Sequence, residues 1–146
     1  MKTKNGLFTF VALFLMSLLF TSFISKKQLL VDIWEDLERF HQAIALTFHP
    51  AEDGDFEPVK NDSKELVEAA EKLSSSKLPS YFDKNENLKN ELYTILEKLV
   101  IQTKDLDRLV EEKTATDQEL LAQLNALHTT YHHIEGINRQ AKEAKK

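Results

Sequence analysis

The sequence predicts an all-α protein, an antiparallel up-down-up-down four-helix bundle preceded by an N-terminal signal peptide. Apolar residues recur at helical spacing in four successive segments. The 146 residues include only three glycines and three prolines, whereas an all-β fold needs turn residues about every 8–12 positions. Short connections separate the four segments, so consecutive helices should lie side by side and run in opposite directions.

The first 25 residues have the pattern of a secretory signal peptide. Two lysines precede an uncharged stretch, 7–23, and small polar residues follow it. Phe20 and Phe23 stand where cleavage favours a small residue, so an uncleaved N-terminal membrane anchor is the alternative. Either arrangement exports residues 26–146, the predicted bundle. We therefore expect a periplasmic protein, or one that is anchored in the membrane and faces the periplasm.

The first two predicted helices occupy the first half of the bundle. Helix 28–49 should end at Pro50, because proline cannot continue the hydrogen-bond pattern. Its apolar stripe consists of Leu30, Trp34, Leu37, His41, Ile44 and Phe48, widened by Ile33 and Phe40. A loop at 51–58 precedes a weaker stripe made of Val59, Leu66, Ala70 and Leu73. The Ser- and Pro-containing segment 74–85 then reads as a connector.

The last two predicted helices are longer. The third stripe consists of Leu88, Leu92, Ile95, Leu99, Leu106 and Val110. Thr116 and Glu119 form a capping-box pattern, which predicts the start of the fourth helix. Its stripe consists of Leu120, Leu124, Leu127, Tyr131 and Ile134, and the lysine-rich segment 139–146 is expected to be its fraying end. Trp34 and Tyr131 are predicted core residues.

Composition excludes several classes of function. The chain has no cysteine, so disulfides, thiolate metal sites and covalent c-type haem are excluded. Residues 26–146 carry 17 basic and 24 acidic side chains, a net charge of −7, which is unsuitable for binding nucleic acid. No nucleophile motif, phosphate-binding Gly-rich loop or H-E-x-x-H motif is present. We therefore do not expect an enzyme.

Histidines are the candidate ligands. His128 and His132 are four residues apart, so they share one helix face, and His41 falls within the stripe of the first helix. If the first and last helices are antiparallel neighbours, His41 is level with about Thr129, within one turn of both. Three converging imidazoles are typical of a Zn²⁺, Cu²⁺ or Ni²⁺ site.

The other polar residues near this face receive different assignments. His49 lies about 12 Å along the helix from His41, so spacing alone leaves it outside the ligand set. His133 points about 100° away from His132 and should face solvent. The carboxylates of Asp36, Glu38 and Glu135 are candidate fourth ligands. The alternative for His41 is a hydrogen-bonded core residue without a ligand.

Two segments carry a resemblance to a known superfamily. The chain resembles the four-helix cytochromes of the c-prime and periplasmic b types, and His132 in "HTTYH" matches their haem-ligand histidine. His128 and Tyr131 replace both cysteines of Cys-x-x-Cys-His, and the first helix lacks the methionine ligand of the b type. "WEDLERFHQAIALTFHP" and "LHTTYHHIEGI" are more similar to a haem-less branch of small exported bundles. That resemblance implies a role for His49, through "FHP".

Three functions are consistent with these observations. The first is a periplasmic protein for metal sensing, buffering or delivery, with His41, His128 and His132 as ligands and His49 as an additional one. The second is a haem-binding electron-transfer protein with His132 as axial ligand. The third is a structural or interaction module without a ligand. Expected partners are a metal ion, the membrane only through an uncleaved N-terminal segment, and a second copy of the chain in a homodimer.

Overall fold

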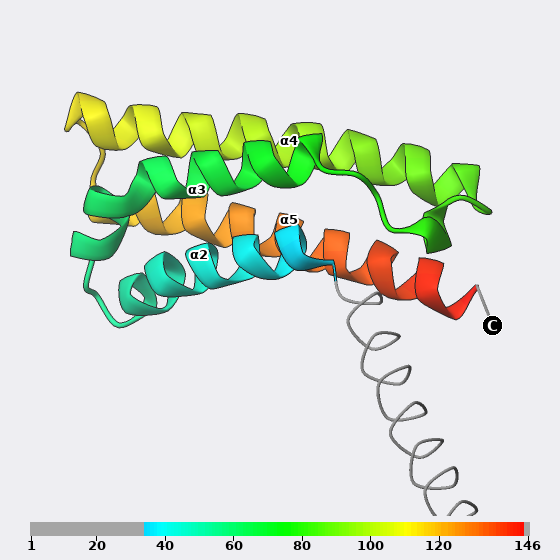
Figure 1. Cartoon of the computed structure of the whole chain (residues 1–146). Helices are drawn as coiled ribbons and strands as arrows, with labels where there is room; N and C mark the ends of the chain where they lie inside the picture. Colours follow the sequence, from blue (N-terminus) through cyan, green and yellow to red (C-terminus); the bar gives the residue numbers. More distant parts are fainter. Residues whose placement is uncertain (1–33, 145–146) are drawn as a thin grey trace, which may run out of the picture. The chain divides into compact units, whose positions relative to one another are not determined.

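The computed structural model describes residues 34–144, and in that range it is all-helical and without strands. The helices α2 (Glu35–Glu52), α3 (Glu57–Ser75), α4 (Glu86–Glu112) and α5 (Asp117–Glu143) form a four-helix bundle, and a 3₁₀ helix, η1 (Ser80–Phe82), precedes α4 (Figure 1). The predicted signal peptide, residues 1–25, lies outside the described residues. Within 34–144, no helix is both long and apolar enough to cross a membrane.

Each helix packs against two others. α3 contacts α2 and α4, and α5 contacts α4 and α2, which closes the ring of four. The seam between α2 and α5 is the least extensive of these contacts. The candidate ligands lie along this seam, and the side chains of His41, His49 and His132 are 41%, 61% and 55% exposed there.

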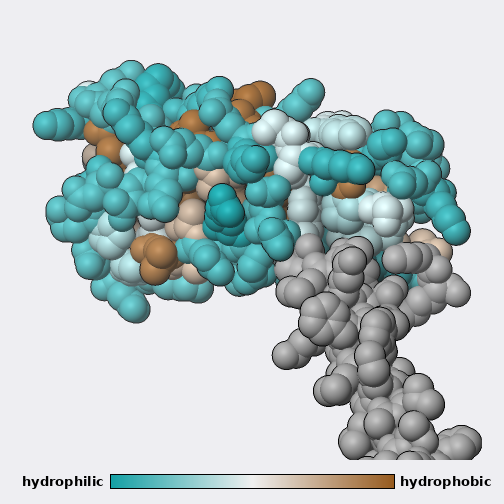
Figure 2. Space-filling model, in the orientation of Figure 1, coloured by the Kyte–Doolittle hydropathy of each residue, from teal (hydrophilic) through white to brown (hydrophobic). Residues whose placement is uncertain are grey.

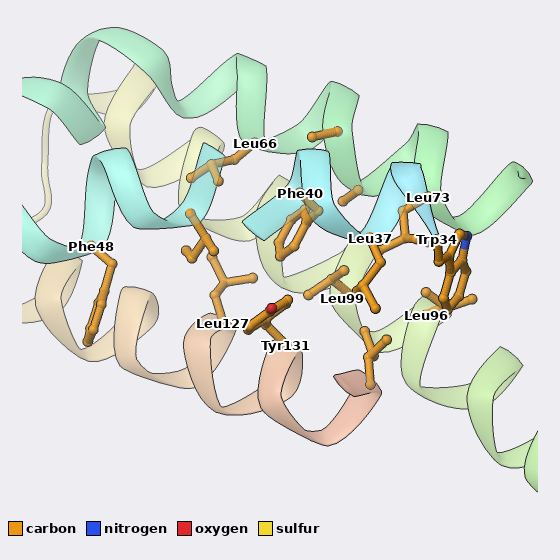
Figure 3. Packing of buried hydrophobic residues seen from close by; sticks show 14 of the residues in the cluster. Trp34, Leu37, Phe40, Phe48, Leu66, Leu73, Leu96, Leu99, Leu127 and Tyr131 are labelled. Atoms are coloured by element: carbon orange, nitrogen blue, oxygen red, sulfur yellow. The ribbon is translucent and has the colours of Figure 1, made fainter. Parts of the chain in front are cut away.

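The core takes apolar side chains from all four helices and from η1. Phe40 and Ile44 of α2, Leu66 of α3, Leu99 of α4 and Leu127 of α5 are completely buried. Figure 3 shows Phe40 and Leu127 pointing into the space between the helices, where burial of apolar surface stabilises the fold. Every residue of the predicted second and fourth stripes is buried, and so are Trp34 and Tyr131, as predicted.

Pro50 does not end the first helix. α2 continues to Glu52 with Pro50 inside it, so the prediction of an end at Pro50 was wrong. Proline in the last turn removes only one helical hydrogen bond. The backbone N–H groups of Asp53 and Asp55 donate to the carbonyl of Pro50, which completes the helix end. The loop to α3 is correspondingly shorter than the predicted 51–58, and Gly54 supplies its positive φ of 88°.

The connector and the C-terminal segment belong to the core, in contrast to their prediction. Phe82 of η1 is completely buried and meets Trp34 edge to face, with ring centres 6.0 Å apart. The Tyr81 hydroxyl donates to Asn138 Oδ1 of α5 over 2.6 Å. The expected fraying end is helical to Glu143, and Ala141 is buried. The last turns of α5 therefore pack against η1.

The capping box at the start of α5 is formed as predicted. The Thr116 hydroxyl accepts from the Glu119 backbone N–H over 3.2 Å, and Glu119 Oε2 accepts from the Thr116 backbone N–H over 2.8 Å. The second hydrogen bond lowers the pKa of the Glu119 carboxyl, because it favours the charged form. Both partners satisfy backbone donors that the first helical turn leaves free.

Replacing Thr116 by alanine should lower the free energy of unfolding by about 1 kcal/mol, because one of these donors loses its acceptor. Thr116→Ser keeps the hydroxyl and should behave like the wild type. Denaturant unfolding followed by circular dichroism measures both variants. Equal stability of the alanine and serine variants would contradict a stabilising role for this cap.

Candidate functional site

Four of the five histidines gather along the seam between α2 and α5. His41 and His49 come from α2, and His128 and His132 come from α5. We call these four residues the histidine cluster. His128 is central to it, since its ring centre is 4.5 Å from that of His132 and 6.1 Å from that of His49.

Aromatic side chains of the core position the cluster from beneath. The ring of Phe48 stacks on His128, with centres 4.2 Å apart, and the ring of Tyr131 stacks on His41 at 4.7 Å. Figure 3 shows Phe48 reaching from α2 toward α5 and Tyr131 from α5 toward α2. The two buried rings form a floor, so the imidazoles above them lie at the boundary between core and solvent.

Three members of the cluster each have a glutamate three residues away on the same helix. His49 Nδ1 lies 3.1 Å from Glu52 Oε2, and His132 Nδ1 lies 3.1 Å from Glu135 Oε2. His41 Nδ1 lies 4.0 Å from Glu38 Oε1, which is too long for a hydrogen bond but close enough for an ion pair. A carboxylate at Nδ1 favours the tautomer with its proton on that atom, which leaves the lone pair on Nε2.

The structure corrects the placement of two predicted ligands. His41 was expected within the apolar stripe, but its side chain is 41% exposed, because Phe40 and Ile44 face the core and His41 lies at the edge. His49 was placed outside the set by its distance from His41. Its neighbour is instead His128 on α5, which the spacing along one helix does not reveal.

The other predictions for this region have mixed outcomes. His133 faces solvent, as predicted, and its Nε2 lies 3.1 Å from Glu91 Oε1 of α4. The predicted level of His41, opposite Thr129, is two residues from its observed neighbour Tyr131. Glu38 and Glu135 lie beside histidines, whereas Asp36 does not form such a pair. Glu52 was not predicted, although the H-x-x-E spacing at 49–52 repeats that at 132–135.

Burial changes the acid–base behaviour of two residues in this region. The pKa of His128 is lowered from its ordinary 6.5, first by desolvation and then by the nearby His132 and His49. Burial raises the pKa of Tyr131 to about 12, and the carboxylates of Glu135 and Glu38 add to this. At neutral pH His128 is therefore an uncharged imidazole, the form that binds metals, and Tyr131 is an uncharged phenol.

The lowered pKa of His128 predicts a pH dependence of stability. As pH falls through 6.5, the unfolded chain takes up a proton on this histidine before the folded chain does. The contribution of His128 to the free energy of unfolding is therefore full above pH 6.5 and is lost as pH falls toward the lower pKa of the folded state. NMR titration of the folded chain should give His128 a midpoint below 6.5, and titration in urea should restore the ordinary value. A folded midpoint at or above 6.5 would exclude the desolvated position.

As the side chains stand, no three His, Asp or Glu residues within 34–144 are arranged to hold a metal ion. The donor set is nevertheless suitable, because imidazole nitrogen and carboxylate oxygen are common ligands of Zn²⁺, Cu²⁺ and Ni²⁺. No family model, curated protein or solved structure matches this chain.

Proposed function

We propose that the protein binds a Zn²⁺, Cu²⁺ or Ni²⁺ ion at the histidine cluster, for metal sensing, buffering or delivery in the periplasm. His128 and His132 are the principal ligands, His49 is the third, and His41 is an additional donor. The main support for this proposal is the spacing of the imidazole rings of His128, His132 and His49. Because metal–nitrogen bonds are about 2 Å long, two imidazoles on one tetrahedral ion have ring centres roughly 5 Å apart. The observed 4.5 and 6.1 Å lie on either side of that value.

Binding through three Nε2 atoms requires the side chains to rotate, because no three donors within residues 34–144 are arranged around an ion as they stand. The side chains of His132 and His49 are 55% and 61% exposed, so rotating them disturbs little packing. Glu52 and Glu135 at the Nδ1 atoms would hold the ligand tautomer, as carboxylates do beside many metal-bound histidines. A water molecule or one of the nearby glutamates could complete four-coordination.

Packing favours a bare ion over haem. A haem bound through His132 would need space for a porphyrin beside α5, but Phe40, Phe48, Leu127 and Tyr131 fill the core there. Two surface grooves, of about 400 and 520 Å³, lie at other places, and neither is lined by a histidine. A relation to the haem-less branch of the four-helix cytochromes, supported by the segments 34–50 and 127–137, is also consistent with a bare ion.

The proposed protein is exported, and its helices run up, down, up and down. The signal peptide at 1–25, with an anchor as its alternative, would bring the bundle to the periplasm. The up-down-up-down course is supported by pairs of neighbours. Trp34 at the start of α2 donates a hydrogen bond to Ser76 at the end of α3, and His49 near the end of α2 lies beside His128 rather than beside the end of α5.

Calorimetric titration of the full chain with each ion tests the proposal. The chain is purified in mild detergent through a tag without histidine, and residues 1–33 contribute no histidine of their own. One ion per chain with a dissociation constant below about 1 µM is the expected result. A Soret band in the purified protein would favour haem instead. If none of the three ions bound and none changed the melting temperature, the metal site would be excluded and a structural or interaction module without a ligand would be the remaining function.

A further inference from the structure

A surface groove lies between α2 and α3, and no histidine of the cluster lines it. It has a volume of about 400 Å³, and its lining includes Arg39, Ala43 and Leu46 of α2 and Glu65, Glu68 and Lys72 of α3. Figure 2 shows apolar residues between hydrophilic ones on the face over these two helices. The groove therefore combines an apolar floor with a charged rim.

The apolar part of the groove is unusually exposed. Leu46 is 70% exposed, more than any other large hydrophobic residue in the described part of the chain. Ala43 beside it is small, so the surface next to Leu46 is shallow and open to a side chain from outside. Covering Leu46 would remove apolar surface from water, which favours association.

The charges at the rim are divided by sign along the groove. The Trp34–Ser76 hydrogen bond marks the end where α2 starts and α3 stops. At about 1.5 Å per residue, Arg39 and Lys72 lie roughly 6–8 Å from that end, and Glu68 and Glu65 roughly 12–17 Å from it. One end of the groove is thus cationic and the other acidic.

These four charges have no partners within the described residues. Neighbouring helices are joined elsewhere by ion pairs, such as Lys64 with Glu111 and Lys104 with Glu71. Arg39, Lys72, Glu65 and Glu68 take part in none of the ion pairs of residues 34–144. They are available for charges on another molecule.

We propose that a second copy of this chain docks on the α2–α3 groove and forms a twofold symmetric dimer. A twofold axis across the groove places the cationic end of each copy against the acidic end of the other, because such an interface pairs the same surface with itself. The same axis crosses the groove near Ala43 and Ala69, roughly 11 Å from the Trp34–Ser76 end. Each Leu46, roughly 18 Å from that end, then lies against the other copy near the start of its α2 and covers its exposed apolar surface there. The interface is independent of the histidine cluster, which lies on the α5 side of α2.

Charge reversal provides a test that does not depend on the apolar N-terminal segment. Two full-length variants are made, Arg39→Glu/Lys72→Glu and Glu65→Lys/Glu68→Lys, and one carries an isotope label. In the first variant all four rim charges are negative, and in the second all four are positive. Each should associate with itself at least about 100-fold more weakly than the wild type, since like charges across an interface cost several kcal/mol.

Mixing the two variants restores opposite charges at both ends of the groove. Native mass spectrometry and sedimentation equilibrium in mild detergent should then show a mixed dimer, with an affinity within about tenfold of the wild-type dimer. Lys98→Glu/Arg139→Glu makes the same change in net charge as the first variant, but on exposed residues outside the groove, and this control should dimerise like the wild type. Circular dichroism verifies that every variant remains helical.

Three results would overturn the proposal. The first is a wild-type chain that stays monomeric at about 1 mM, a concentration at which even weak dimers form. The second is undiminished self-association of both charge-reversed variants, which would assign any dimer to another surface. The third is a mixture of folded variants without mixed dimers, which would show that the groove charges do not face each other. A Leu46→Asp variant with wild-type dimer affinity would equally exclude the apolar contact that Leu46 makes with the second copy.

Discussion

Replacing His128 and His132 together by alanine is expected to weaken metal binding by more than about 100-fold. Loss of a residue that merely supports a ligand costs about 10–100-fold in metal affinity, and this variant loses two of the proposed ligands. The pair lies on one face of α5 with ring centres 4.5 Å apart. Calorimetric titration of the variant and the wild type with the same ion measures the difference.

Single variants separate the contributions of the remaining histidines. His49→Ala should weaken binding more than His41→Ala, because His49 is beside His128, whereas His41 stacks on Tyr131. His133→Ala is the matched control, since this histidine is also exposed on α5 but pairs with Glu91 of α4. If His133→Ala weakened metal binding as much as the His128→Ala/His132→Ala variant does, the ion would be binding nonspecifically to surface histidines, and the proposed site would be wrong.

Replacing Phe82 by alanine is expected to lower the free energy of unfolding by about 3–5 kcal/mol. Phe82 belongs to the connector between α3 and α4, yet it is completely buried and contacts the rings of Trp34 and Tyr81. Removing it leaves a cavity next to the starts of α2 and α4, which the surrounding helices cannot fill without moving.

Denaturant unfolding compares this variant with Tyr93→Ala in α4. Tyr93 is also aromatic but is 44% exposed, so its replacement should change the free energy of unfolding by only about 0.5 kcal/mol. Comparable small losses in both variants would show that the connector is peripheral. A large loss for Phe82 alone would establish η1 as part of the core.

Much of the fold follows from local information in the sequence. The stripe of α5, from Leu120 to Ile134, and its start at Thr116 depend on helical periodicity and on a cap that acts within one turn. The same local reasoning predicted that His128 and His132 share a face and that His133 faces solvent. These features depend only on residues close together in the chain.

The sequence by itself thus determined the helices, the core stripes and the histidine pair of α5. Tertiary structure alone decided that η1 and the last turns of α5 enter the core, because Phe82 and Asn138 meet partners far away in the chain. It also decided that His49 joins His128 while His41 moves to the edge. Those positions depend on how α2 rotates and shifts against α5, and the apolar period constrains neither the rotation nor the shift closely enough.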